Sequence, residues 1–221
     1  MPGAAPPPTA RGAQGSVSAP GAGRLLLATT STHKIGELRK IFAGLALQLV
    51  TPMDLSLDLD PEETGSTFSE NATIKARAFA AASGLPSLAD DSGLEVDALD
   101  GEPGVRSKRY AGPAATDADR VALLLRNLGR VPEEKRTARF RCVMVLATPN
   151  AVVGEVDGTC EGRIAMAPRG THGFGYDPVF LLPDRGLTMA ELCAEEKHAI
   201  SHRGRAGRSA RALIERWLGK R

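Results

Sequence analysis

The stretch Leu88-Ala89-Asp90-Asp91-Ser92-Gly93-Leu94-Glu95-Val96 decides the fold that we expect for this chain. An apolar run, Pro86 to Ala89, leads into two carboxylates, a hydroxyl and a glycine, after which apolar residues resume. This pattern is typical of a buried strand that ends in charge at the edge of a sheet, where ligands of α/β proteins bind. Because neighbouring side chains of a strand point to opposite faces, we expect different roles for Asp90 and Asp91. Gly93 then allows a turn, or the close approach of a ligand to the backbone. Taken alone, the stretch is equally consistent with a turn that carries solvated acids.

Upstream of this stretch, a predicted strand and a predicted helix enclose a polar turn. The strand covers residues 24–28, and the helix runs from Ile35 to Phe42 and ends at Gly44. The turn, Thr29 to Lys34, combines hydroxyls with a lysine at a helix N-terminus. Free backbone N–H groups, the helix dipole and an ammonium favour an anion there. The spacing of a Walker P-loop is absent, and a capped helix with a surface lysine is the alternative.

Helices and strands alternate through the rest of the chain. Thr67 to Glu70 is a capping-box signature that opens an alanine-rich helix ending at Gly84, and in this helix Asn71 and Lys75 share a face. The later predicted elements are a helix from Thr116–Asp119 to Asn127, paired strands at 140–147 and 151–157 with an extension at 158–167, a strand at 179–182, a capping box at Thr188 and Glu191, and a final helix with Leu213, Ile214, Trp217 and Leu218 apolar.

Length and composition limit the class of protein. With 221 residues and 42% hydrophobic content, the chain can form one core or two lobes that share a sheet. The net charge of +2 does not by itself indicate a nucleic-acid partner. The three cysteines form no Cys-x-x-Cys pair, which favours a reducing compartment, and we expect the cytoplasm. No apolar stretch approaches the roughly 20 residues that cross a membrane. Residues 1–23 are rich in Pro, Gly, Ala and Ser and predict a disordered tail, whereas residues 24–221 predict a single domain.

Polar clusters lie at the ends of four predicted elements. Acids beside lysines and glycine turns suggest a phosphate ester held by Mg²⁺, because this ion takes few carboxylates and completes its shell with water and phosphate. The four histidines lack the His-Glu-x-x-His spacing of zinc hydrolases, and a Gly-x-Ser-x-Gly elbow is absent. The clusters are Thr29–Lys34, Glu62/Glu63, Asp90–Ser92, and Phe174–Asp177 with Lys197–Arg203.

Four motifs, in order, resemble the inosine triphosphate pyrophosphatase family, also called XTP/dITP diphosphatases. The similarity runs from about Arg24 to Trp217 and leaves out only the predicted tail. The motifs are Ala28-Thr29 through Lys34; Ser69-Glu70-Asn71-Ala72 with Lys75-Ala76-Arg77; Ala89-Asp90-Asp91-Ser92-Gly93-Leu94; and Gly173-Phe174-Gly175-Tyr176-Asp177-Pro178 with Glu196-Lys197 and Ser201-His202-Arg203-Gly204.

The resemblance implies a fold and an activity. The implied fold is α/β, with an elongated mixed β-sheet flanked by helices and two lobes around a central nucleotide-binding cleft, usually in a homodimer. The implied activity is hydrolysis of deaminated purine nucleoside triphosphates (ITP, dITP or XTP) to the monophosphate and pyrophosphate, which keeps these bases out of nucleic acid. It also implies one Mg²⁺ per subunit.

The resemblance further implies roles for single residues. Asp91 matches the proton acceptor and a magnesium ligand, and Glu62 matches the other ligand. Thr30-Ser31 departs from the Gly-Asn that the family often has. The assignment requires that the first turn, the middle acids and the late aromatic loop share one pocket. The implied substrate-binding residues are Thr29, Thr30, Ser31, Thr32, His33, Lys34, Lys75, Ser92, Phe174, Gly175, Tyr176, Asp177, Lys197, His202 and Arg203.

Two other classes of protein fit parts of the sequence. Asp91-Ser92-Gly93 resembles the Asp-Ser/Thr-Gly of aspartic peptidases, but a single copy would need a homodimer and the helix-rich pattern is unlike an all-β peptidase. The arginines of the C-terminal helix could form a nucleic-acid-binding surface. They lack interleaved aromatic residues, however, so we expect a solvated face and no stable nucleic-acid partner.

Overall fold

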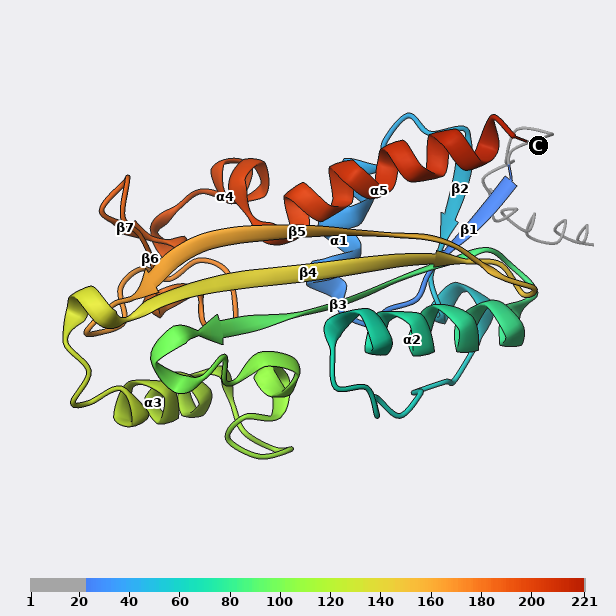
Figure 1. Ribbon diagram of the computed structural model, residues 1–221. Coiled ribbons are helices and arrows are strands. Elements are labelled where there is room, and N and C mark those ends of the chain that lie inside the picture. Colours follow the sequence, from blue (N-terminus) through green and yellow to red (C-terminus); the bar gives the residue numbers. More distant parts are fainter. Residues whose placement is uncertain (1–22, 221) are drawn as a thin grey trace, which may run out of the picture.

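The computed structural model describes residues 23–220, which form an elongated mixed sheet with helices on its faces (Figure 1). The sheet has the strand order β2-β1-β3-β4-β5-β6-β7. β1 is parallel to β2 and β3, and the remaining neighbours are antiparallel, so the predicted fold class is confirmed. The strands are β1 (Gly23–Leu27), β2 (Leu47–Val50), β3 (Ser87–Val96), β4 (Thr137–Ala147), β5 (Val152–Ile164), β6 (Phe180–Leu182) and β7 (Leu187–Thr188).

Helices pack on both faces of the sheet. Leu38 of α1 and Ala210 of α5 share a core with the apolar side chains on one face of β1, β3 and β4, whereas α2 covers the other face through its alanines and Phe79. At the far end, α3 packs with β6 in a third core. The helices are α1 (Thr32–Ile41), α2 (Phe68–Ser83), α3 (Asp117–Asn127), α4 (Ala194–Ile200) and α5 (His202–Leu218).

The strand β3 differs from the prediction at the acidic pair. It does not end before Asp90 but continues to Val96, because β4 pairs with it along its whole length. The parallel partner β1 pairs with β3 only as far as Leu88. Beyond Leu88 this edge of β3 is therefore free of β1, and the two acids lie at an edge, as expected, although inside a strand. Gly93 makes no turn, because it lies inside β3. Its lack of a side chain instead allows the backbone of the 3₁₀ helix η3 (Gly104–Arg109) to approach closely, and an added Cβ would collide with the Gly104 carbonyl.

Local helix signals in the sequence match the structure. The Thr67/Glu70 capping box begins α2, and a Thr116/Asp119 capping box begins α3. The paired strands predicted around residue 150 are β4 and β5, and residues 158–164 extend β5 as expected. The predicted tail, residues 1–23, lies outside the described residues except for Gly23, which begins β1.

Cys142 packs in the core, and two arginines of α5 donate hydrogen bonds to backbone carbonyls of neighbouring elements. Cys142 is fully buried in the core, as predicted, and burial raises the pKa of its thiol to about 12. Arg205 donates to the Thr159 carbonyl and Arg211 to the Ile41 and Ala43 carbonyls, so these side chains attach α5 to its neighbours. Within residues 23–220, the helices are too short or too polar to cross a membrane.

Candidate active site

One cavity joins segments that are far apart in the sequence. It has a volume of about 360 Å³, which is within the range of small-molecule sites. Its lining includes Lys34 after β1, Asp91 in β3 and Phe174 in the loop before β6. The expectation that the first turn, the middle acids and the aromatic loop share a pocket is therefore confirmed.

The first end of the cavity is the N-terminus of α1. The cap residue Ser31 makes no side-chain capping bond, and the first turn holds no acidic residue, in contrast to the capped α2 and α3. The Ser31 amide donates to the Thr29 hydroxyl over 3.2 Å, which closes the turn. The uncapped N–H groups and the positive end of the helix dipole make this end suitable for an anion.

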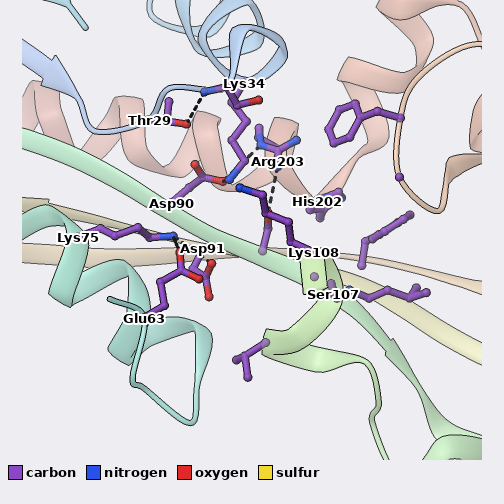
Figure 2. A pocket seen from close by; sticks show the side chains of 18 of the residues that line it. Thr29, Lys34, Glu63, Lys75, Asp90, Asp91, Ser107, Lys108, His202 and Arg203 are labelled. Atoms are coloured by element: carbon purple, nitrogen blue, oxygen red, sulfur yellow. Dashed lines mark hydrogen bonds and ion pairs between the residues drawn. The ribbon is translucent and has the colours of Figure 1, made fainter. Parts of the chain in front are cut away.

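Asp91 lies on the α2 face of the sheet, where two side chains of α2 contact its carboxylate. Lys75 lies close to one carboxylate oxygen (Figure 2), at 3.1 Å. The Asn71 amide donates to the other oxygen over 3.3 Å. Asn71 and Lys75 therefore share a helical face, as predicted, and this face of α2 contacts the Asp91 carboxylate. Burial raises the pKa of Asp91, and the nearby Lys75 only partly opposes this effect.

Glu63 shares the ammonium of Lys75 with Asp91. Its carboxylate is 2.7 Å from Lys75 and 3.5 Å from Arg109. Burial favours a higher pKa for Glu63, but the hydrogen bond and charge of Lys75 outweigh burial and lower it. Burial favours a lower pKa for Lys75, but the charges of Asp91 and Asp90 outweigh burial and raise it. The result is a cation held between two carboxylates.

These two carboxylates fit the needs of Mg²⁺. Both supply hard oxygen donors, and they converge on one cation, the Lys75 ammonium, in an open cavity. Mg²⁺ binds one or two carboxylates and takes its remaining ligands from water and phosphate. Among the described residues no group of three or more His, Cys, Asp and Glu side chains is placed to hold a metal, so a closed zinc-type cage is not formed.

Asp90 points to the opposite face and joins two cations. Its carboxylate is 2.9 Å from Lys34 and 3.5 Å from the Nε of Arg203 (Figure 2). The side chain is only 2% exposed. Burial favours a higher pKa, but the charges of Lys34 and Arg203 hold the pKa of Asp90 well below its usual range. Asp90 thus connects the helix α1 end of the cavity to α5.

The second end of the cavity is formed around the Phe174 ring. Lys197 lies 4.7 Å and Arg203 5.7 Å from its centroid. The Phe174 amide donates to Asp177 over 2.8 Å, and Lys197 forms an ion pair with the same carboxylate. An added Cβ at Gly173 would collide with that carboxylate, so the loop requires glycine there. Burial raises the pKa of Asp177 despite the lysine.

His202 and Arg203 begin α5 and are both buried. The His202 ring stacks on Phe140 with centroids 4.8 Å apart, and burial together with the charge of Arg203 lowers the pKa of His202 well below its ordinary value. Arg203 is held by Glu37 at 3.0 Å and by the Ser92 hydroxyl at 3.0 Å. The site therefore presents a neutral imidazole and a fixed guanidinium.

Most sequence-predicted site residues line this cavity, but three do not. Thr32 and His33 are exposed, although the His33 ring reaches to 5.4 Å from the Phe174 ring. Glu62 is exposed as well, and in this loop it is the neighbouring Glu63 that lines the cavity. The predicted residues that line the cavity are Thr29, Thr30, Ser31, Lys34, Lys75, Asp91, Ser92, Phe174, Gly175, Tyr176, Asp177, Lys197, His202 and Arg203.

The cavity also contains charged residues that sequence reasoning missed. Lys108 follows Ser107 in η3 and points into the cavity (Figure 2). Asp117 and Arg120 come from the first turn of α3, and they form an ion pair. Lys108 lies in a segment with several glycines, residues 101–112, and Asp117 lies in an acidic helix start. Neither sequence pattern indicates that these side chains lie near the acids of β3.

Comparisons with known proteins agree with this geometry. A model of the Ham1 family matches residues 25–213. A dITP/XTP pyrophosphatase of Geobacillus kaustophilus is 50% identical over 193 residues, which are 87% of this chain and 93% of that protein. A dITP/XTP pyrophosphatase of Geobacter sulfurreducens is 50% identical over 196 residues, or 89% and 96% of the two chains. The solved structure of a HAM1 protein from Coxiella burnetii has a TM-score of 0.82 at 44% identity and covers 88% of this chain and 99% of that chain.

These matches extend over most of the chain in sequence and in three dimensions. They include all four motifs, from the turn after β1 to the start of α5, because the family model spans residues 25–213. The resemblance that those motifs indicated is confirmed, and the chain belongs to the Ham1 family.

Proposed function

We propose that this chain is a nucleoside triphosphate pyrophosphatase that hydrolyses deaminated purine nucleotides such as ITP, dITP and XTP to the monophosphate and pyrophosphate. The observation that carries the proposal is a single cavity in which an uncapped helix N-terminus with lysines, the Asp91 carboxylate and an aromatic, donor-rich end occur together. The names of the relatives, dITP/XTP pyrophosphatase, support this substrate class. The reaction would remove such nucleotides from the nucleotide pool.

The triphosphate binds at the α1 end in this proposal. The turn Thr29 to Ser31 and the first amides of α1 donate hydrogen bonds to phosphate oxygens, and Lys34 and Lys75 add positive charge. Ser31 can donate through its hydroxyl, which makes no capping bond to α1. Both lysines already pair with aspartates, so phosphate binding exchanges part of these ion pairs for contacts to substrate.

Asp91 acts as the proton acceptor in this proposal. It takes a proton from a water molecule that attacks the α-phosphorus, and pyrophosphate leaves. In the absence of a bound metal ion, burial raises the pKa of Asp91. Asn71 and Lys75 hold its two oxygens and so fix its orientation. Bound by Glu63 and Asp91, Mg²⁺ would act as a Lewis acid that neutralises developing phosphate charge. We therefore propose Glu63, and not Glu62, as the second ligand.

Selectivity for the base comes from the other end of the cavity. Phe174 can stack on a purine, and Arg203 and His202 can donate to the 6-oxo group of hypoxanthine or xanthine. Adenine has an amino group at that position and would leave buried donors without a partner, which can discriminate strongly between substrates. Lys197 and Asp177 fix the loop around Phe174.

A pyrophosphate-release panel tests the proposal. The full-length protein is assayed with ITP, dITP, XTP, ATP and GTP, each with Mg²⁺ and with excess EDTA. We expect the highest kcat/KM for the deaminated purines and loss of activity in EDTA. Equal rates for ITP and ATP would remove the selectivity claim, because the donors around Phe174 separate a 6-oxo from a 6-amino group, and an activity insensitive to EDTA would remove the role of the metal.

Further properties remain predictions from the sequence and, for the homodimer, from the family resemblance. We expect residues 24–221 to act as a single domain, the protein to form a homodimer, and its location to be the cytoplasm without a stable nucleic-acid or membrane partner. The match of the family model to residues 25–213 supports the single domain. Light scattering of the purified protein tests the homodimer, and a monomer mass would contradict it.

A further inference from the structure

The loop that carries Phe174 is rich in glycine and needs external support. Gly170, Gly173 and Gly175 all have positive φ values, at 79°, 78° and 65°. Glycine reaches this conformation at little steric cost, but it loses more conformational entropy on ordering than other residues. The Phe174 amide bonds to Asp177, which pairs with Lys197 of α4, and the Tyr176 hydroxyl donates to the Ser107 carbonyl over 2.8 Å. Neither contact holds the Gly175 backbone itself.

Asp117 attaches this tip to another element. Its Oδ2 accepts a hydrogen bond of 2.7 Å from the Gly175 amide, 58 residues away in the sequence. Its other carboxylate oxygen forms an ion pair with Arg120. Arg120 in turn donates to the Ala115 carbonyl over 2.6 Å and to the Lys108 carbonyl over 3.0 Å. The carboxylate is therefore fixed on α3, and the residue after Phe174 is bound to it.

The helix itself does not need Asp117 as a cap. Thr116 is the N-cap of α3, and the capping box is completed by Asp119, whose Oδ2 accepts from the Thr116 amide over 2.8 Å. Asp117 lies in the same turn and lines the cavity. Burial favours a higher pKa for its carboxyl, but the Gly175 amide and Arg120 outweigh burial and lower the pKa, so the acceptor is charged near neutral pH.

We propose that Asp117 is a positioning residue for the base-binding end of the cavity, where it acts through the Gly175 amide to hold Phe174 in the position that stacks on the substrate. The proposal rests on the proposed function and deepens it, because it adds an element, α3, to the residues that select the base. Without this bond the Gly175 backbone is held only through its neighbours, Asp177 with Lys197 and Tyr176 with Ser107, so the tip gains conformational freedom that substrate binding must remove.

The experiment compares Asp117→Ala, Asp117→Asn and the matched control Asp119→Ala. All three remove one negative charge from the same turn, but Asp119→Ala removes a capping residue and leaves the Gly175 bond in place. We expect Asp117→Ala to raise the KM for ITP about tenfold, the value of a hydrogen bond to a charged group, with kcat changed less than about threefold. The Asn variant keeps an acceptor and should recover part of this loss. The Asp119→Ala variant should keep the KM of the unmodified protein.

A double-mutant cycle with Phe174→Ala tests whether Asp117 acts through the ring. If it does, Asp117→Ala raises KM much less in the Phe174→Ala background than in the unmodified chain. Full additivity, or an equal KM increase in Asp119→Ala, would overturn the proposal.

Hydrogen exchange separates this proposal from the proposed function. The Gly175 amide should exchange about tenfold faster or more in Asp117→Ala than in Asp119→Ala, whichever nucleotide the enzyme prefers. If none of the purine triphosphates is hydrolysed, the proposed function fails, whereas unchanged Gly175 exchange in Asp117→Ala would overturn the positioning role itself.

Discussion

The carboxylates of Asp90 and Asp91 leave β3 on opposite faces of the sheet, and each meets a different lysine. Asp90 lies 2.9 Å from Lys34 on the face covered by α1 and α5, whereas Asp91 lies 3.1 Å from Lys75 on the face of α2. Their pKa values move in opposite directions, because two cations outweigh burial at Asp90, whereas burial dominates at Asp91. Two neighbouring residues of the same type therefore have different effects on stability and on turnover.

Replacing Asp91 by Asn should abolish turnover without unfolding the protein. The amide keeps the shape of the side chain but removes the base and a metal ligand, and we expect kcat to fall about 100-fold or more. Lys75 retains its 2.7 Å ion pair with Glu63, so no buried cation is left alone. Because burial raises the pKa of Asp91, its charge opposes folding at neutral pH, and the variant should be at least as stable as the unmodified chain. Pyrophosphate release and a urea unfolding curve measure the two effects, and near-normal turnover would refute the assignment.

Replacing Asp90 by Asn should instead destabilise the fold. The change removes the buried counter-charge of Lys34 and leaves the almost fully buried Arg203 with Glu37 as its remaining ion-pair partner. Removing one partner of a buried ion pair costs about 3–5 kcal/mol. We expect a loss of this size in the free energy of unfolding at pH 7, measured in urea. A variant as stable as the unmodified protein would contradict the structural role of Asp90.

The same pair of proteins gives a prediction for pH. The folded-state pKa of Asp90 is below its ordinary value of 3.8, so its contribution to stability is present above that value and is lost as pH falls through the folded pKa. The stability difference between the unmodified protein and Asp90→Asn should therefore be constant from pH 7 to about pH 5 and shrink below about pH 3.8. Urea unfolding at several pH values measures it, and a difference that increases toward acid pH would show that the sign is wrong.

The order of elements could be predicted from the sequence because its signals are local. Capping boxes, apolar periodicity and hairpin turns each depend on a few neighbouring residues, and α2, α3 and the pair β4–β5 follow them. The four motifs predicted most of the residues that line the cavity, because they mark the ends of elements that meet there.

The remaining features depend on partners that are distant in the sequence. The length of β3 is set by its pairing with β4, so the apolar run before Asp90 wrongly predicted the end of the strand. Asp117 looked like an ordinary acid in a helix start, since its partner Gly175 is 58 residues away. The choice between Glu62 and Glu63 depends on the direction of a loop, which an Asp-Pro-Glu-Glu sequence does not specify.

The two neighbouring glutamates form a matched pair for the metal. Glu63→Gln removes a proposed ligand, whereas Glu62→Gln removes the same charge from an exposed side chain one residue away. We expect Glu63→Gln to raise the Mg²⁺ concentration for half-maximal activity about tenfold or more and Glu62→Gln to leave it unchanged, because the charge of a ligand decides its contribution to binding. A titration of ITP hydrolysis with Mg²⁺ measures both. The opposite order would return the role to Glu62, the residue that the family resemblance indicates.

Two glycines should respond in opposite ways to alanine. At Gly93 a new Cβ would collide with the Gly104 carbonyl, the Ser107 hydroxyl and the Phe68 ring, and η3 would have to move away from β3. Such overpacking costs about 1–3 kcal/mol, and because Ser107 and Lys108 of η3 line the cavity, the KM for ITP should also rise. At Gly36, in the interior of α1, the Cβ meets nothing within 4 Å, so Gly36→Ala should stabilise the protein by about 0.5–1 kcal/mol through the helix propensity of alanine. Urea unfolding of both variants measures the contrast. If Gly93→Ala were as stable as Gly36→Ala, the close approach of η3 to β3 would not be the reason for glycine in the acidic stretch.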